Sequence, residues 1–155
     1  MKESSILTIK IPPPIVTLIF SGLMYLLSAV NDFQVAGFNK AWLIIILLVI
    51  AIFLLFPAVV QFYRSKTTVN PLKPETSSVL VKTGIYYYSR NPMYLGMAFF
   101  LLAWLVFLGN PFNIIIFIGF ILFMNRFQIK FEEQALEKLF GDDFRQYIQK
   151  VRRWI

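Results

Sequence analysis

The chain has 155 residues, of which 58% are hydrophobic and only 15% are charged. A soluble domain carries roughly 25% charged residues, so this composition excludes an ordinary soluble domain. Cysteine and histidine are both absent, which excludes a disulfide framework, a thiolate nucleophile, an imidazole base and a His/Cys metal site. We therefore expect a membrane protein without such a metal site, whose chemistry uses other side chains.

Three long uncharged runs organise the chain, at 11–30, 41–63 and 91–125. Since a bilayer core of roughly 30 Å takes about 20 helical residues, the first two runs each predict one span. The third run is too long for one helix, and the Gly-Asn-Pro step at 109–111 interrupts it with residues that favour a turn. This run predicts a tight helical hairpin.

We accordingly predict an all-α polytopic membrane protein, a single integral membrane domain over 1–155 with a cytoplasmic helical tail. The prolines at 12–14 are expected to start the first helix, and no cleavage site of small residues marks a signal peptide. The expected segments are four transmembrane helices at 12–30, 41–63, 92–108 and 111–129, a cytoplasmic loop at 64–91 and a tail at 130–155.

The net charge of +7 is unevenly distributed along this topology. With four spans, the N-terminus, the loop and the tail share one side, which holds fourteen of the fifteen Lys and Arg residues; only Lys40 lies on the other. The positive-inside rule therefore predicts a multi-pass protein of the cytoplasmic membrane with both termini in the cytoplasm. Topology and attraction to lipid headgroups account for the basic total, so we expect membrane lipids as partners and no nucleic acid.

The tail predicts a helix that continues from the fourth span to a C-cap at Gly141, followed by a second helix that the aspartates at 142–143 start. Apolar residues follow helical spacing in this second helix, with basic residues opposite. These apolar residues are Phe144, Tyr147, Ile148 and Val151. The pattern is typical of a helix that lies along the membrane interface.

Two polar faces follow the fourth span as it leaves the bilayer. Asn125, Gln128 and Glu132 share one face at helical spacing, so they are expected to point toward one place. Ionisable groups at this depth are costly unless they face protein, water or a ligand, which makes this face a candidate site. The second face carries Arg126, Lys130, Glu133 and Glu137. On the second face we expect the two cations to pair with the two carboxylates.

The segment at 84–96, GIYYYSRNPMYLG, joins the loop to the third span. Its tyrosines alone are typical of an aromatic belt at a membrane surface. Its two glycines also allow close approach to a ligand, or tight helix packing. Pro92 favours a helix start there, which leaves free backbone N–H groups that suit a carboxylate or a phosphate.

Two stretches resemble the isoprenylcysteine carboxyl methyltransferase family of small membrane methyltransferases. They are LVKTGIYYYSRNPMYLG at 80–96 and FEEQALEKLFGDDFRQYIQKVRRWI at 131–155. The family carries a pattern of the type L-V-x-x-G-x-Y-x-x-x-R-H-P-x-Y-x-G and a downstream E-E-x-x-L-x-x-x-F-G-x-x-Y-x-x-Y. Both motifs occur here in the right order around the expected hairpin, and TTVNP at 67–71 is similar to the bacterial branch.

The resemblance implies that S-adenosylmethionine binds between the loop and the cytoplasmic ends of the last helices. It implies methyl transfer to a lipophilic or small acceptor, either a carboxylate of the isoprenylcysteine type or an amine such as a phospholipid. The implied cofactor-binding residues are Val79, Leu80, Val81, Tyr86, Asn91, Pro92, Met93, Tyr94 and Glu132. Glu133 and Arg90 are the candidate catalytic residues, and Gln128 and Asn125 are the candidate substrate residues.

The sequence departs from the family pattern at two positions. Asn91 replaces the family's His, and Gln128 stands where the eukaryotic enzymes have an Arg four residues before the acidic pair. An amide offers a carboxylate neither a full positive charge nor the bidentate fork of Arg, so an amine acceptor remains open. Methyl transfer itself is an in-line displacement that depends on positioning more than on acid–base groups.

Two other functions remain open on the sequence. The first is an NADPH-dependent membrane reductase of the sterol-reductase type, whose cofactor phosphates would need a cluster of cations. Arg64, Lys66, Arg152 and Arg153 are available for that cluster. The second is a non-catalytic membrane subunit with the same fold, which the departures at Asn91 and Gln128 motivate.

Overall fold

A computed structural model describes residues 11–30, 33, 40–64 and 79–155. Every regular element in these ranges is helical, which confirms the predicted all-α class for them. The elements are α1 (Pro13–Ala29), α2 (Ala41–Arg64), η2 (Gly84–Tyr87), α3 (Pro92–Leu108), α4 (Asn113–Phe123), η3 (Met124–Ile129), α5 (Lys130–Phe140) and α6 (Asp142–Lys150). The predictions that concern TTVNP and Lys66 lie outside the described residues.

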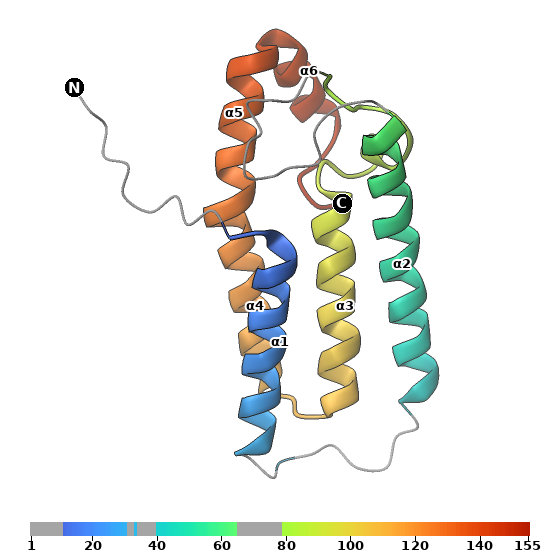
Figure 1. The fold of residues 1–155 in the computed structure, drawn as a ribbon, viewed down its shortest axis with the longest axis vertical. Coiled ribbons are helices and arrows are strands. Elements are labelled where there is room, and N and C mark those ends of the chain that lie inside the picture. Colours follow the sequence, from blue (N-terminus) through green and yellow to red (C-terminus); the bar gives the residue numbers. More distant parts are fainter. Residues whose placement is uncertain (1–10, 31–32, 34–39, 65–78) are drawn as a thin grey trace, which may run out of the picture.

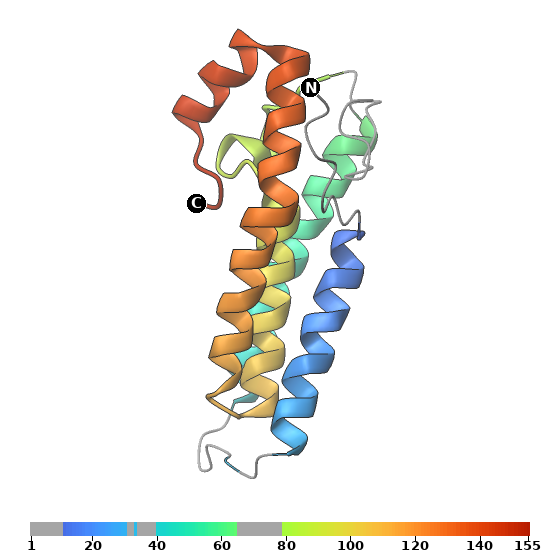
Figure 2. The ribbon, with the colours of Figure 1, turned by 90° about the vertical axis from the view of Figure 1, so that its left-hand side faces the viewer.

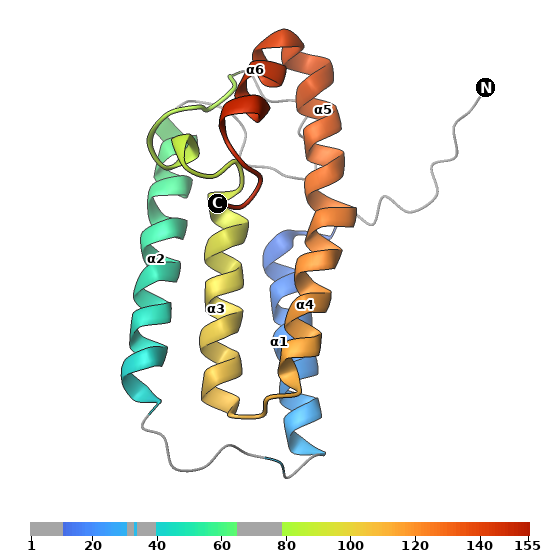
Figure 3. The same cartoon turned by 180° about the vertical axis from the view of Figure 1, so that it is seen from behind.

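Helices α1 to α4 run side by side, and we call them the body (Figure 1). Helices α4, η3 and α5 form one continuous rod that extends past α1, α2 and α3 (Figure 2). From the far end of the rod, α6 and the C-terminal segment fold back toward the start of α3 (Figure 3). We call residues 79–91 and 130–155 the cap, because they cover this end of the body.

Local sequence sets the ends of the helices. Pro92 occupies the first turn of α3 and Pro13 that of α1, as expected where a proline lacks only an N–H that would be unpaired anyway. Gly109 (φ 68°) ends α3 and Gly141 (φ 50°) ends the rod, both in backbone conformations that favour glycine. These positions confirm the predicted starts, the turn after α3 and the C-cap of the rod.

Gly96 allows α2 and α3 to pack closely. A Cβ at this position would lie 2.6 Å from Leu55 Cγ and 3.0 Å from the Ala51 carbonyl oxygen. Of the two roles that the sequence suggests for Gly96, the structure therefore shows tight helix packing. On the other side of α3, Trp104 Nε1 donates to the Ser21 carbonyl at 3.0 Å and joins α3 to α1.

The outer surface of the body is strongly apolar. Exposed side chains on α1, α2 and α4 include Leu18, Ile45, Val49, Phe53 and Ile115. Among the described residues, two helical segments are long and apolar enough to cross a membrane, Ala41–Gln61 and Asn113–Phe140, and only 11% of the first is buried inside the protein. Exposed apolar surface on this scale is typical of a membrane protein.

Helix α6 packs on the protein instead of lying free on a membrane. Phe144, Tyr147 and Val151 are buried and contact apolar side chains of the cap. These partners are Leu80, Leu136 and Phe140. The prediction that this apolar face lies along the membrane interface is therefore wrong, because α5 and the chain at 79–91 provide a protein surface for it.

Candidate functional site

Helices α3 and α5 bring two of the predicted cofactor residues into contact. Tyr94 lies in the first turn of α3 and is only 7% exposed. Glu132 lies in the first turn of α5, and its Oε1 accepts a hydrogen bond from Tyr94 Oη. Around this contact Tyr94 packs with apolar side chains that include Met124 and Ile129. The structure therefore places a carboxylate and a phenol together at the junction of the body and the cap.

The tyrosines of the 84–96 segment face in different directions. Tyr86 is 5% exposed and packs with Val81 and with Ala58 of α2. Burial raises the pKa of Tyr86, so its phenol stays neutral. Tyr87 and Tyr88 are largely exposed and contact each other edge to face. Tyr86 therefore belongs to the interior of the cap, whereas the other two suit an interfacial belt.

Tyr147 of α6 fixes the position of this segment. Its Oη donates to the Tyr86 carbonyl oxygen at 2.6 Å. Burial raises the pKa of Tyr147 to about 12, so it acts as a neutral donor. Nearby, Leu80 packs against the α6 cluster while Val81 packs with Tyr86, and Val79 is exposed. Leu80 and Val81 thus lie between α6 and the tyrosine segment, whereas Val79 does not contribute to this packing.

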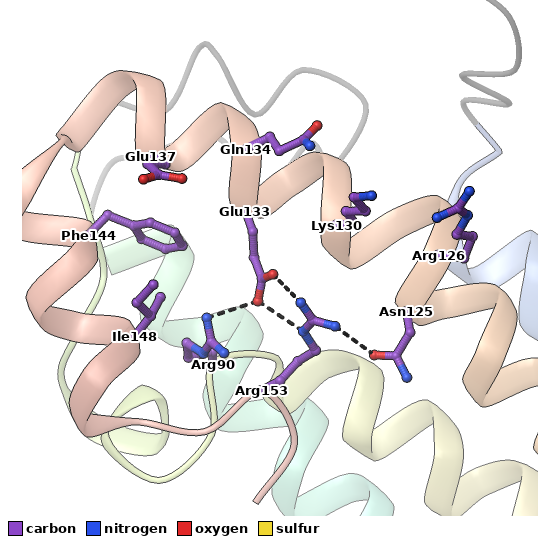
Figure 4. A pocket seen from close by; sticks show the side chains of 10 residues that line it. All are labelled: Arg90, Asn125, Arg126, Lys130, Glu133, Gln134, Glu137, Phe144, Ile148 and Arg153. Atoms are coloured by element: carbon purple, nitrogen blue, oxygen red, sulfur yellow. Dashed lines mark hydrogen bonds and ion pairs between the residues drawn. The ribbon is translucent and has the colours of Figure 1, made fainter.

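Glu133 pairs with two arginines, whereas its neighbour Glu132 contacts Tyr94. Figure 4 shows the partners of Glu133. Its Oε1 lies 2.9 Å from Arg90 Nη1, and its two oxygens accept hydrogen bonds from Nε and Nη2 of Arg153. The two candidate catalytic residues, Glu133 and Arg90, are therefore in direct contact. Burial lowers the pKa of Arg90, and the adjacent Glu133 carboxylate opposes this effect.

The C-terminal segment at 151–155 completes this network. The Arg90 N–H donates to the Arg152 carbonyl at 3.1 Å, and the Asn91 side chain donates to the Arg153 carbonyl at 2.9 Å. Asn125 Oδ1 accepts a hydrogen bond from Trp154 Nε1 at 3.1 Å. Asn91, the residue that replaces the family's His, therefore holds the main chain of the C-terminal segment.

A cavity of about 440 Å³ lies between α5, α6 and the C-terminal segment (Figure 4). Its charged lining consists of Arg90, Arg126, Lys130, Arg153, Glu133 and Glu137. Phe144 and Ile148 form an apolar part of the lining. Neither Tyr94 nor Glu132 lines this cavity. The two carboxylates of the acidic pair, Glu132 and Glu133, therefore lie in different surroundings.

Comparison with known sequences decides the family. Residues 39–143, more than half of the chain, match the family described as phospholipid methyltransferase. The chain belongs to the phospholipid methyltransferase family. The matched residues include α2, α3 and the whole rod with the acidic pair, and they leave out α1, most of α6 and the C-terminal segment.

Two of the relatives are named as methyltransferases. The chain is 37% identical over 79 residues to a protein-S-isoprenylcysteine O-methyltransferase of Saccharomyces cerevisiae, covering 51% of this chain and 33% of that protein. It is 33% identical over 94 residues to that of Schizosaccharomyces pombe, covering 61% and 40%. An uncharacterized protein of Haemophilus influenzae is 52% identical over its whole length of 63 residues, 41% of this chain.

These matches confirm the resemblance to the isoprenylcysteine carboxyl methyltransferases. The chain spans well under half the length of the two yeast enzymes that it matches. No solved structure matches the chain. The positions of the family's motif residues therefore come from the structure of this chain.

In this member of the phospholipid methyltransferase family, the predicted face of Asn125, Gln128 and Glu132 is not formed. Element η3 is a π-helix with i→i+5 hydrogen bonds, so it turns the residues after it relative to those before it. Asn125 faces the C-terminal segment, and Glu132 faces α3. Gln128 is buried, and its Nε2 donates to the Ile11 carbonyl at 2.7 Å. The prediction that these three residues point toward one place is wrong, because it assumed α-helical spacing.

The expected ion pairs along the rod are also wrong. Glu133 pairs with Arg90 and Arg153, and Glu137 pairs with Arg145 Nε at 3.0 Å. Their partners come from the loop, α6 and the C-terminal segment, which local helical spacing does not predict. Within the part of the chain that the structure describes, no carboxylate lies within ion-pair distance of Arg126 or Lys130.

Sequence reasoning missed the role of the C-terminal segment in the site. Arg153 appeared there only as a basic residue of an amphipathic tail or as a candidate cation for a reductase. In the structure it binds Glu133 of the acidic pair, 20 residues earlier. The sequence gives one hint of this role. The acidic pair and the Arg-Arg-Trp sequence at 152–154 both lie in the stretch at 131–155 that resembles the family.

Proposed function

We propose that this chain is an integral membrane methyltransferase that transfers a methyl group from S-adenosylmethionine to a lipophilic or small acceptor. The observation that carries the proposal is the contact between Tyr94 and Glu132 at the junction of body and cap. Both residues belong to the motifs shared with the family, and they meet although 38 residues separate them. The yeast relatives are named as O-methyltransferases, which supports methyl transfer as the activity.

We further propose that α1, α2, α3 and the α4 part of the rod all cross the membrane, with α3 and α4 as a hairpin. The chain would be one membrane domain with a cytoplasmic cap and cytoplasmic termini. α1 and α3 have 17 residues each and are apolar. At 1.5 Å per residue each is about 26 Å long, close enough to a bilayer core for modest local adjustment.

The residues at the junction fit the chemistry of the proposed cofactor. The Glu132 carboxylate suits ribose hydroxyls or the ammonium group, and the rings of Tyr86 and Tyr94 suit adenine and the sulfonium cation. Pro92 starts a helix whose first backbone N–H groups suit a carboxylate. The remaining proposed contacts are Val79, Leu80, Val81, Asn91 and Met93. Asn91 would act by holding the C-terminal segment in place.

When bound, S-adenosylmethionine supplies an activated methyl group for an in-line displacement, in which the acceptor lone pair forms the new bond as the carbon–sulfur bond breaks. The protein contributes alignment and the exclusion of water. The buried side chains of Tyr86, Tyr94 and Val81 would keep water away from the proposed donor site. The acceptor would approach from the bilayer between the helices, while the donor arrives from the cytoplasm.

The acceptor class remains a choice between a carboxylate and an amine. A carboxylate needs no base, whereas an ammonium must first lose a proton. Glu133 already forms an ion pair with Arg90 and accepts hydrogen bonds from Arg153, so we propose that water takes such a proton. Glu133 and Arg90 then serve to position the C-terminal segment. Gln128 is engaged with the start of α1, so a substrate role for it would require that bond to break.

Thermal stability of the purified protein in detergent tests this function. S-adenosylhomocysteine is expected to raise the unfolding temperature, and NADPH is expected to leave it unchanged, because ligands that bind only the folded state stabilise it. Stabilisation by NADPH alone would favour the reductase, and stabilisation by neither would favour the non-catalytic subunit. Radiolabelled methyl transfer into a lipid extract then identifies the class of acceptor.

A further inference from the structure

The cavity in the cap has the dimensions of a ligand site. Its volume of about 440 Å³ falls within the range of roughly 300–1,000 Å³ that is typical of small-molecule sites. It opens between the rod, α6 and the C-terminal segment (Figure 4). Since neither Tyr94 nor Glu132 lines it, the cavity is separate from the contact that we assign to the methyl donor.

The charges around the cavity do not balance. Arg90 and Arg153 share a single carboxylate, that of Glu133. Glu137 pairs with Arg145, which does not line the cavity. Arg126 and Lys130 line it with no carboxylate of the described residues within ion-pair distance. A surplus of positive charge therefore faces this space, and it favours an anionic ligand.

Arg90 provides a second, independent observation. Its Nε is buried and has no hydrogen-bond partner among the described residues, although Nη1 of the same guanidinium lies 2.9 Å from Glu133. A buried donor without a partner is costly, so native proteins normally pair such groups with protein, water or ligand. A phosphate has several acceptor oxygens and matches the fork of a guanidinium.

The positions of Arg126 and Lys130 indicate where the anion comes from. Arg126 lies in η3, two residues before Gln128, which contacts Ile11 just before α1 begins. Lys130 lies about one turn further along the rod. Under the proposed topology, this is the level at which the helices leave the cytoplasmic leaflet. Lysine and arginine at this level attract the headgroups of anionic lipids.

We propose that this cavity binds a phosphate group through Arg90, Arg126 and Lys130, and that the phosphate belongs to an anionic phospholipid of the cytoplasmic leaflet. Only the assignment to the leaflet rests on the proposed membrane topology. The binding itself requires neither the methyl donor nor methyl transfer. A failure of this proposal would therefore leave the proposed function intact, and the reverse also holds.

A pair of charge-matched variants tests the site. In the cavity variant, Arg126→Gln and Lys130→Gln remove the two cations that have no ion-pair partner among the described residues. In the control variant, Lys138→Gln and Lys150→Gln remove two exposed cap lysines that do not line the cavity. Phosphatidylglycerol is titrated into full-length protein in a neutral detergent, and binding is followed by thermal stabilisation. We expect at least tenfold weaker binding in the cavity variant and less than a twofold change in the control.

Inorganic phosphate, titrated without lipid, separates the two sources of the anion. Binding of phosphatidylglycerol but not of millimolar inorganic phosphate supports the lipid headgroup. Equal binding of both would overturn the assignment to lipid. Equal weakening in the two variants, or no binding of either probe to the unaltered protein, would overturn the site. If the double cavity variant does not fold, Lys130→Gln and Lys138→Gln provide the same comparison, because both side chains are exposed.

Discussion

The body and the cap of this protein are stabilised in different ways. The body depends on apolar packing and on helix ends set by local residues, such as Pro92 and Gly109. The cap has a small apolar cluster around Phe144, but it also depends on polar contacts between distant residues, such as Asn91 with Arg153, 62 positions apart. The membrane-facing part therefore follows from hydrophobic pattern, whereas the proposed site depends on a few specific partners. Substitutions in the two regions should consequently have different effects.

The largest effect on the body is expected at Gly96. Gly96→Ala would place a Cβ 2.6 Å from Leu55 Cγ and 3.0 Å from a backbone oxygen of α2. We expect a loss of roughly 1–3 kcal/mol in the free energy of unfolding, because overpacking of a tight contact forces helices apart. Unfolding of the purified protein in detergent measures this effect.

Gly22→Ala is the matched control for Gly96→Ala. A Cβ on Gly22 of α1 would meet nothing within 4 Å, so the change should be neutral or stabilise the helix by up to about 1 kcal/mol. Similar losses of stability for the two glycines would show that close packing between α2 and α3 does not determine the stability of the body.

In the cap, Glu133→Gln should produce the next largest effect. It removes the charge that Arg90 and Arg153 share, in a network whose side chains are mostly buried. Hydrogen bonds to charged groups contribute about 1.5–3 kcal/mol, so we expect a loss near 2 kcal/mol. Because the C-terminal segment depends on this contact, hydrogen exchange of residues 141–155 should accelerate by about tenfold or more.

Glu137→Gln provides the comparison on the same helix. Its partner Arg145 is largely exposed, and exposed ion pairs contribute about 0–1 kcal/mol. Exchange in 141–155 should therefore change little. If Glu137→Gln loosened the segment as much as Glu133→Gln, the network around Glu133 would not be what holds it.

A smaller effect is expected at Tyr147. Tyr147→Phe deletes the hydrogen bond to the Tyr86 carbonyl and leaves that oxygen without this partner. We expect a loss of about 1 kcal/mol, measured as the free energy of unfolding. Tyr87→Phe alters an exposed hydroxyl of the same type, so its effect should be close to zero.

Part of the molecule could be predicted from the sequence because the relevant chemistry is local. Pro13, Pro92, Gly109 and Gly141 act on their own backbone, so they reveal helix ends without knowledge of the fold. The approach of Tyr94 and Glu132 was expected from the two motifs of the family. It could not have come from helical periodicity, because the two residues lie on different helices.

The remaining features depend on tertiary structure. The π-helix at Met124–Ile129 changes which residues share a face. It could not be predicted, because its sequence is also typical of an ordinary α-helix. Its effect is to separate Gln128 from Glu132 and to bring Asn125 to Trp154. The pairing of Glu133 with Arg153 needs the fold-back of α6, which places the last residues of the chain beside the acidic pair.

Equilibrium binding of S-adenosylhomocysteine to the purified protein tests the central claim most directly. Glu132→Gln should lower its affinity at least tenfold, because the Glu132 carboxylate is the proposed charged contact to the donor. Asp142→Asn, which alters a carboxylate that is 89% exposed at the start of α6, should bind as the unaltered protein does. Equal affinity in all three proteins would contradict the proposed donor site beside Tyr94.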